Sequence, residues 1–265
     1  MEYLFYLGIG AIAGLISGLF GLGGGAIVVP MLIFAFIARG IPAEIVTHLA
    51  IGTSLATIIF TALSSIYTHH QKHAIRLDLV RQLVPGILLG SLLGGLFAVS
   101  ISGVLLQLLF GGFMMAVALQ LLIYTPKKGV KSMPGPVGMG FAGGTIGGVS
   151  ALFGIGGGTL TTPYLSFFGV SIHQAVGTSA ACGLPIALAA SFVYATADVS
   201  DIELPSGSLG YIFLPAWLGI IVTSLPFARL GAQQAHRFNA LQLRTAFGWL
   251  MMILGARFIW INLPV

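Results

Sequence analysis

The apolar residues of this chain form ten stretches separated by short polar segments, and this pattern limits the fold more than any other feature. Only 6% of the 265 residues are charged, whereas a water-soluble domain has about 25%. So few charges cannot cover the surface of a soluble globule. This excludes a soluble enzyme, a nucleic-acid-binding protein and a disordered chain, and the sequence predicts an all-α integral membrane protein.

Six stretches are long enough to cross the hydrocarbon core, which takes about 20 helical residues. They are Ile45–Tyr67, Leu79–Val99, Val104–Tyr124, Ile172–Ala195, Leu209–Ala228 and Leu241–Asn262. Two others, Ala26–Ala38 and Thr159–Phe168, are too short, and each follows a glycine cluster. Short, glycine-interrupted segments at matching places in two halves of a chain often mark the binding site of a transporter.

The two halves of the chain share three sequence landmarks in the same order. GLFGLGGGAIVVP at 18–30 aligns with ALFGIGGGTLTTP at 151–163, HLAIGTS at 48–54 with HQAVGTS at 173–179, and FGGFMM at 110–115 with FGWLMM at 247–252. This order indicates a tandem duplication. We expect a first repeat at residues 1–124, a cytoplasmic linker at 125–136 and a second repeat at 137–265.

Equivalent loops of the two repeats carry opposite charge. The loop after Tyr67 holds Lys72, Arg76 and Arg81, whereas its counterpart after Ala195 holds Asp198, Asp201 and Glu203. Basic loops face the cytoplasm, so the two loops lie on opposite sides of the membrane. The sequence therefore predicts two inverted-topology repeats, each a broken Gly-rich helical hairpin plus three transmembrane helices, with both termini outside the cytoplasm.

The glycine runs are the main candidate site. Glycine tolerates positive φ and lets a ligand approach the backbone closely, and a Gly-rich turn before a helix offers free N–H groups to an anion. Non-helical backbone at membrane depth must be buried in protein or line a wet cavity. The candidate anion-binding glycines are Gly23, Gly24 and Gly25 in the first repeat, and Gly156, Gly157 and Gly158 in the second. Close helix packing is the alternative role for these residues.

The paired H-x-x-x-G-T-S segments are the second candidate. The hydroxyl groups of Thr53, Ser54, Thr178 and Ser179 can donate hydrogen bonds to an anion. Their ordinary alternative is a bond to a backbone carbonyl within the helix. His48 and His173 precede these residues by about one turn and titrate near neutral pH. They are the candidates for proton coupling, with an interfacial position near a helix end as the alternative.

The site chemistry that this sequence lacks is also informative. No Asp or Glu falls inside an apolar stretch, so a carboxylate proton relay or cation site of the usual kind is not expected. Cys182 is the single cysteine, and no Cys/His cluster has zinc spacing. We therefore expect no metal and no cofactor, and we attribute the net charge of +5 to cytoplasmic loops rather than to nucleic-acid binding.

The duplicated FGxGGG…P segment with its following GTS resembles the sulfite exporter TauE/SafE family over nearly the whole chain. The resemblance implies a multi-pass plasma-membrane protein that exports sulfite or a small organosulfur anion. It carries over to Gly23–Gly25, Gly156–Gly158 and the two Thr-Ser pairs. The chain departs from internal symmetry at Thr159, where the first repeat has Ala26, which suggests more polar contacts from the second hairpin.

A secondary anion transporter that works by alternating access is the function expected from these features. An anion channel is the first alternative, and it would need a continuous polar pore. A membrane-embedded enzyme is the second, and it would need a nucleophile–base pair or a metal site, neither of which is evident. The expected partners are a small anion and the lipid bilayer. A homodimer is compatible with the sequence.

Overall fold

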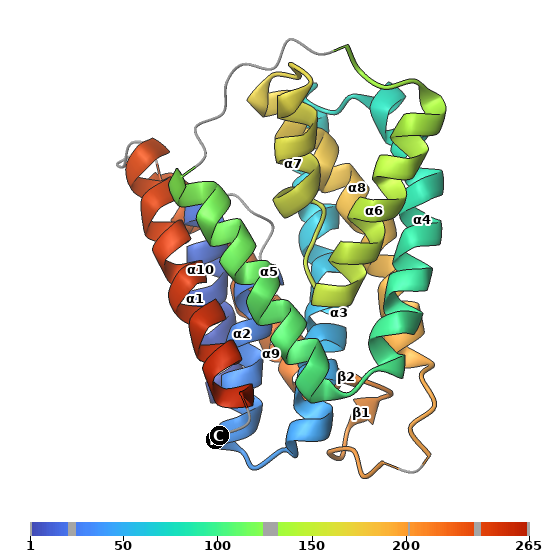
Figure 1. Ribbon diagram of the computed structural model, residues 1–265. Helices are drawn as coiled ribbons and strands as arrows, with labels where there is room; N and C mark the ends of the chain where they lie inside the picture. Colours follow the sequence, from blue (N-terminus) through green and yellow to red (C-terminus); the bar gives the residue numbers. More distant parts are fainter. Residues whose placement is uncertain (1, 21–24, 124–131, 201, 236–239, 264–265) are drawn as a thin grey trace.

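The computed structural model describes residues 2–20, 25–123, 132–200, 202–235 and 240–263. Within these ranges the chain forms ten α-helices and one two-stranded antiparallel hairpin (Figure 1). The elements are α1 Glu2–Phe20, α2 Gly25–Ala38, α3 Ala43–Gln71, α4 Leu77–Ser100, α5 Gly103–Ile123, α6 Pro136–Phe153, α7 Gly158–Phe167, α8 Ile172–Ala195, β1 Ser208–Leu209, β2 Ile212–Phe213, α9 Leu214–Ala235 and α10 Ala240–Asn262.

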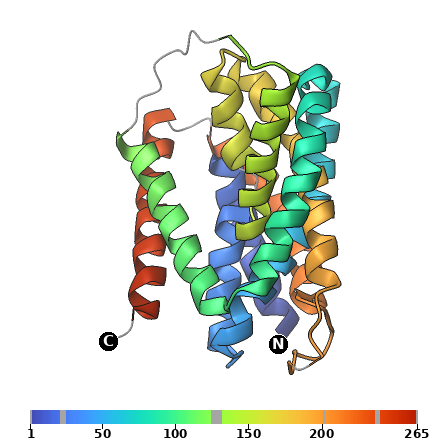
Figure 2. The ribbon, with the colours of Figure 1, turned by 45° about the vertical axis from the view of Figure 1, so that its right-hand side comes forward.

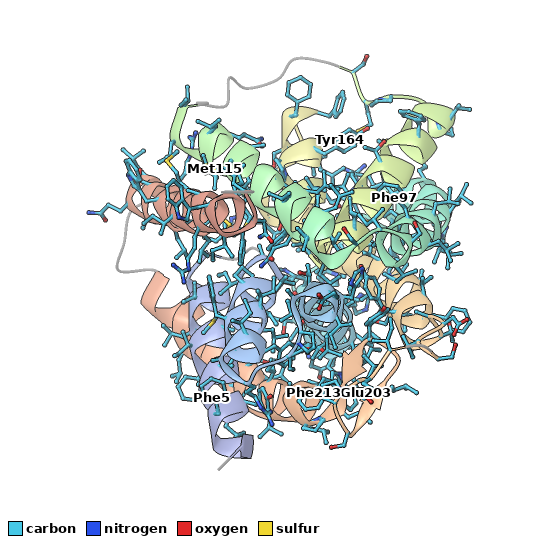
Figure 3. The ribbon with its side chains drawn as sticks, turned by 60° about the horizontal axis from the view of Figure 1, so that its bottom comes forward. Phe5, Phe97, Met115, Tyr164, Glu203 and Phe213 are labelled. Atoms are coloured by element: carbon cyan, nitrogen blue, oxygen red, sulfur yellow. The ribbon has the colours of Figure 1, made fainter. Side chains whose placement is uncertain are left out.

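Six helices among the described residues are long and apolar enough to cross a membrane: α3, α4, α5, α6, α8 and residues Arg244–Asn262 of α10. Large apolar side chains are exposed around the bundle, and Phe5 and Phe97, each about half exposed, lie on different sides of it (Figure 3). Such a surface suits lipid rather than water. These observations confirm the all-α integral membrane fold class.

The apolar stretch Leu209–Ala228 was expected to be one helix, and its first part is not helical. Leu209 belongs to β1, Ile212 and Phe213 form β2, and α9 begins at Leu214. Gly207 and Gly210 take positive φ values of 88° and 51°, which a helix does not accommodate. The turn buries Tyr211, Ile212 and Phe213 under the helices. A run of apolar residues alone does not distinguish such a buried turn from helix.

The two short helices belong to hairpins that enter the molecule from opposite ends. We call the end where α1 begins and α10 ends the lower end, and the opposite end the upper end (Figures 1 and 2). At 1.5 Å per residue, α2 with 14 residues spans about 21 Å and α7 with 10 residues about 15 Å. Neither crosses the full core. The α1–α2 hairpin opens toward the lower end and the α6–α7 hairpin toward the upper end (Figure 1).

Helices from the two halves of the chain pack against each other throughout. α1 lies along α9, α6 along α4, α10 along α5, and α3 along α8. Glycines make the α4–α6 contact close: an added Cβ on Gly86, Gly90 or Gly94 would lie 1.9–2.3 Å from a carbonyl oxygen of α6. The helical backbones therefore touch directly, which is typical of small-residue packing in membranes.

Candidate functional site

The two glycine turns meet inside the molecule. Gly25 begins α2, and an added Cβ there would lie 2.5 Å from the carbonyl oxygen of Gly154 and 2.8 Å from Cα of Ile155. Gly154 ends α6 with a left-handed φ of 66°, and Ile155 is fully buried. Only a residue without a side chain fits this contact. Gly23 and Gly24 lie outside the described residues.

A cavity of about 320 Å³ lies beside these turns. Its walls come from α1, α2, α3, α8, α9 and the turn before α7. The volume accommodates a small anion together with several waters. Of the residues expected to bind an anion, six line this cavity: Gly25, Ser54, Gly156, Gly157, Gly158 and Ser179.

One face of α3 supplies most of the hydroxyl groups of the cavity. The lining residues on this face follow a spacing of three and four: Ser54, Thr57, Thr61, Ser64 and Thr68. This spacing keeps them on one side of the helix, over about 21 Å. The cavity therefore extends from the glycine turns to the upper end of α3. Four of these residues, Thr57, Thr61, Ser64 and Thr68, were not among the candidates expected from the sequence, although their spacing is visible inside an apolar stretch.

The cavity mouth carries positive charge. The exposed Arg229 on α9 supplies this charge, and His69 at the end of α3 also lines the cavity. The described lining residues include no Asp or Glu. A site with a guanidinium and no carboxylate favours an anion over a cation.

The three positions of each G-T-S motif have different roles. The glycine contacts the backbone of a loop. A Cβ added to Gly52 would lie 2.3 Å from the carbonyl oxygen of Tyr211, and a Cβ added to Gly177 would lie 2.5 Å from the carbonyl oxygen of Ala74. Each loop comes from the other half of the chain. The glycines of these motifs therefore allow close packing between the halves.

The threonines of the motifs bind the same two loops. Thr53 Oγ1 accepts a hydrogen bond of 2.9 Å from the Phe213 N–H, and Thr178 Oγ1 accepts one of 3.0 Å from the Arg76 N–H. Neither threonine lines the cavity. The Arg76 guanidinium donates to the Asp78 carboxylate at 2.9 and 2.6 Å, and this carboxylate raises the pKa of Arg76. Thr53 and Thr178 thus hold loops in place.

The serines of the motifs face the cavity and are already hydrogen-bonded. Ser54 Oγ donates to the Gly154 carbonyl oxygen at 2.9 Å, which ties α3 to the second glycine turn. Ser179 Oγ accepts from Thr162 Oγ1 and donates to the Val176 carbonyl oxygen, both at 2.8 Å. These two serines are the members of the motifs that remain candidates for ligand contact.

The structure does not bring the two histidines together or to the cavity. His48 is buried, its Nε2 lies 3.0 Å from the Ala98 carbonyl oxygen, and its ring stacks on Tyr211 at 5.0 Å. His173 is exposed near the start of α8. Thr159 is buried in the first turn of α7 and does not line the cavity. Within the described ranges no group of three His, Cys, Asp or Glu side chains could hold a metal ion.

Comparison with known proteins identifies the family of this chain. The sequence model of the family described as "Sulfite exporter TauE/SafE" matches residues 6–258. The chain belongs to this family. A probable membrane transporter protein of Haemophilus influenzae is 34% identical over 93% of this chain and 94% of its own length. One of Methanocaldococcus jannaschii is 26% identical over 93% of this chain and 91% of its own length. No solved structure gave a significant match.

Membership of the TauE/SafE family fixes the broad function. The chain is a multi-pass membrane transporter and not an enzyme, consistent with the plasma membrane as its location. The resemblance noted from the paired glycine and G-T-S segments is thereby confirmed.

Two cavity residues of this TauE/SafE member, Ser224 and Arg229 on α9, were not selected by sequence reasoning as site residues. They lie on the helix that follows the β1–β2 hairpin, and neither belongs to a repeated motif. Only the packing of α9 against α1 brings them to the same wall as the glycine turns.

Proposed function

We propose that this protein is a secondary transporter that exports a small anion, sulfite or a small organosulfur anion, through the cavity beside the paired glycine turns. The anion binds next to Gly25 and Gly156–Gly158, with Ser54 and Ser179 in the same wall. The substrate class follows the family description and the chemistry of the lining.

The observation that carries this proposal is the meeting of a helix start with a cavity whose described lining residues include no Asp or Glu. The three glycines 156–158 line the cavity and lead into α7, whose first N–H groups have no partner within the helix. Such groups, with the positive end of the helix dipole, favour an anion. Among the described lining residues, Arg229 adds a positive charge and no carboxylate opposes it.

Two features support alternating access. The helix pairs form a matched set, since α1 lies along α9 as α6 lies along α4, and α3 and α8 run in opposite directions (Figure 1). This arrangement supports inverted repeats at residues 1–124 and 137–265. In addition, the cavity extends only toward the upper end, because buried aromatic rings of Tyr6, Phe36 and Phe213 pack together near the lower end.

Counterflow in proteoliposomes tests the proposal against a channel. Vesicles that contain the purified protein are loaded with unlabelled sulfite and diluted into labelled sulfite. A carrier accumulates label transiently above its equilibrium level, whereas a channel only equilibrates it. We expect an overshoot with sulfite and none in protein-free vesicles. Label that equilibrates without overshoot assigns a channel, and no uptake of sulfite or of sulfoacetate contradicts the proposed substrate class.

A further inference from the structure

Five hydroxyl groups that line the cavity already donate their protons within the protein. A hydroxyl group has one proton to donate, and an anion needs donors. These five protons go to backbone carbonyl oxygens. Ser54 donates to the carbonyl oxygen of Gly154, Ser179 to that of Val176, Thr57 to that of Thr53, Thr61 to that of Ile58 and Thr68 to that of Ser64. These residues present lone pairs, rather than protons, to whatever occupies the cavity.

Ser224 on α9 is the exception among the buried hydroxyl groups that line the cavity. It is 5% exposed, and its Oγ has no hydrogen-bond partner among the described residues. A buried hydroxyl without a partner is destabilising. Its backbone is fixed, because an added Cβ on Gly14 of α1 would lie 2.5 Å from the Ser224 carbonyl oxygen. The wall therefore holds an unused proton donor in a rigid position.

We infer that the Ser224 hydroxyl donates a hydrogen bond to an oxygen of the transported anion. This inference rests on the proposed function and names a binding residue outside both repeated motifs. The anion would lie between α9 and the N–H groups of the turn at Gly156–Gly158, which lines the same cavity. Arg229 on the same helix lies nearer the mouth and would attract the anion toward this donor.

The test compares two buried serines without a hydrogen-bond partner among the described residues, of which only one lines the cavity. Ser191 on α8 is 6% exposed and its Oγ also lacks a partner among the described residues, but it does not line the cavity. We expect Ser224→Ala to raise the Kd of sulfite about tenfold or more, as for loss of a hydrogen bond to a charged group. Ser191→Ala should change the Kd less than twofold. Isothermal titration calorimetry on the purified full chain measures both.

Conservative variants protect the test from a folding defect. Ser224→Thr keeps the hydroxyl and should restore a Kd within about threefold of the unaltered protein. Where Ser224→Ala does not give a monodisperse protein, Ser224→Cys, with its weaker donor, takes its place in the same comparison. A Kd for the tested variant within twofold of the unaltered protein overturns the inference, even when turnover falls. Absence of saturable binding of both sulfite and sulfoacetate by the unaltered protein would instead overturn the proposed function.

Discussion

Glycine serves two different physical purposes in the site. Gly154 takes a left-handed conformation at the end of α6, which side chains disfavour. Gly157 has an ordinary helical φ of −57°, but an added Cβ would lie 2.6 Å from the Ser179 carbonyl oxygen. Position 157 therefore requires glycine because α8 approaches its backbone closely. The sequence shows that both positions are glycine, and only the packing shows why.

A methyl group at Gly25 should disrupt the contact between the two glycine turns. Its Cβ would lie 2.5 Å from a carbonyl oxygen of the rigid turn at Gly154, and overpacking of this kind costs about 1–3 kcal/mol. We expect Gly25→Ala to lower the melting temperature in detergent and to abolish sulfite binding. Gly112→Ala is the control, since its Cβ would meet no atom within 4 Å. Equal melting temperatures for the two variants would contradict the described contact.

The G-T-S threonines should affect stability without changing affinity. Thr178→Val removes the acceptor for the Arg76 N–H, a loss of about 1 kcal/mol. Because Thr178 does not line the cavity, we expect a lower unfolding midpoint with an unchanged Kd for sulfite. Thr178→Ser should restore the midpoint. A large rise in Kd at an unchanged midpoint would show that Thr178 binds the anion itself.

At the scale of elements, α3 and α9 form the route into the site. The hydroxyl face of α3 leads from the glycine turns to His69, and α9 contributes Arg229 to the wall of the same cavity. The two helices also contact each other directly. An anion that enters from the upper end would meet the charge of Arg229 before it reaches the glycine turns.

The charge at the mouth should act on substrate capture. Arg229 is exposed, and an exposed charge contributes up to about 1 kcal/mol, so Arg229→Gln should raise the KM for sulfite roughly two- to fivefold at low salt. The difference should shrink at about 0.1 M salt, where the Debye length is about 10 Å. Arg229→Lys is the control and should keep the lower KM. A salt-independent effect would indicate a structural role for Arg229. Initial rates of uptake by vesicles measure these values.

The helices were largely predictable from the sequence, and the walls of the cavity were not. Length and apolar composition identified α3, α4, α5 and α8, and the glycine clusters located the breaks before α2 and α7. Two regions are exceptions: Gly207 and Gly210 bend the chain into β1 and β2, and α6, which was not among the six stretches expected to span, has 18 residues and is long enough to do so. Ser224 belongs to the cavity only because α9 packs on α1, which no local pattern indicates.

At the scale of the whole molecule, the charged loops set the orientation in the membrane. The exposed Lys72 directly follows α3, which ends at the upper end, and the exposed Glu203 belongs to the loop between α8 and β1, which lies at the lower end (Figure 1). The basic end should face the cytoplasm. The cavity would then open inward, as an exporter requires when it loads its substrate.

Single cysteines can test this orientation in intact cells. In a Cys182→Ala background, Glu203→Cys should react with an impermeant thiol reagent added outside, whereas Lys72→Cys should react only after the membrane is permeabilised. The expectation follows from the opposite charge of the two loops. Outside labelling of both positions would contradict opposite sides, and protection of both until permeabilisation would contradict it equally.

The histidine-coupling hypothesis is testable with the two gradients set separately. A singly charged anion gains about 2.3 kcal/mol per 100 mV from the membrane potential alone, which needs no titrating residue. Since neither His48 nor His173 lines the cavity, we expect His48→Gln/His173→Gln to retain the response of the unaltered protein to a pH gradient at zero potential. Loss of that response, with voltage-driven flux intact, would assign proton coupling to these histidines.

The pairing of α1 with α9 has a consequence for the order of events during synthesis. α9 begins about 190 residues after α1 ends, so at about 5–20 residues per second the ribosome needs roughly 10 to 40 s to supply this partner. α6 has no such delay, because α4 precedes it in the chain. Gly10 and Gly14, which fit against the α9 backbone, stay without that contact meanwhile. The N-terminal hairpin is therefore made first and gains its α9 partner only late in synthesis.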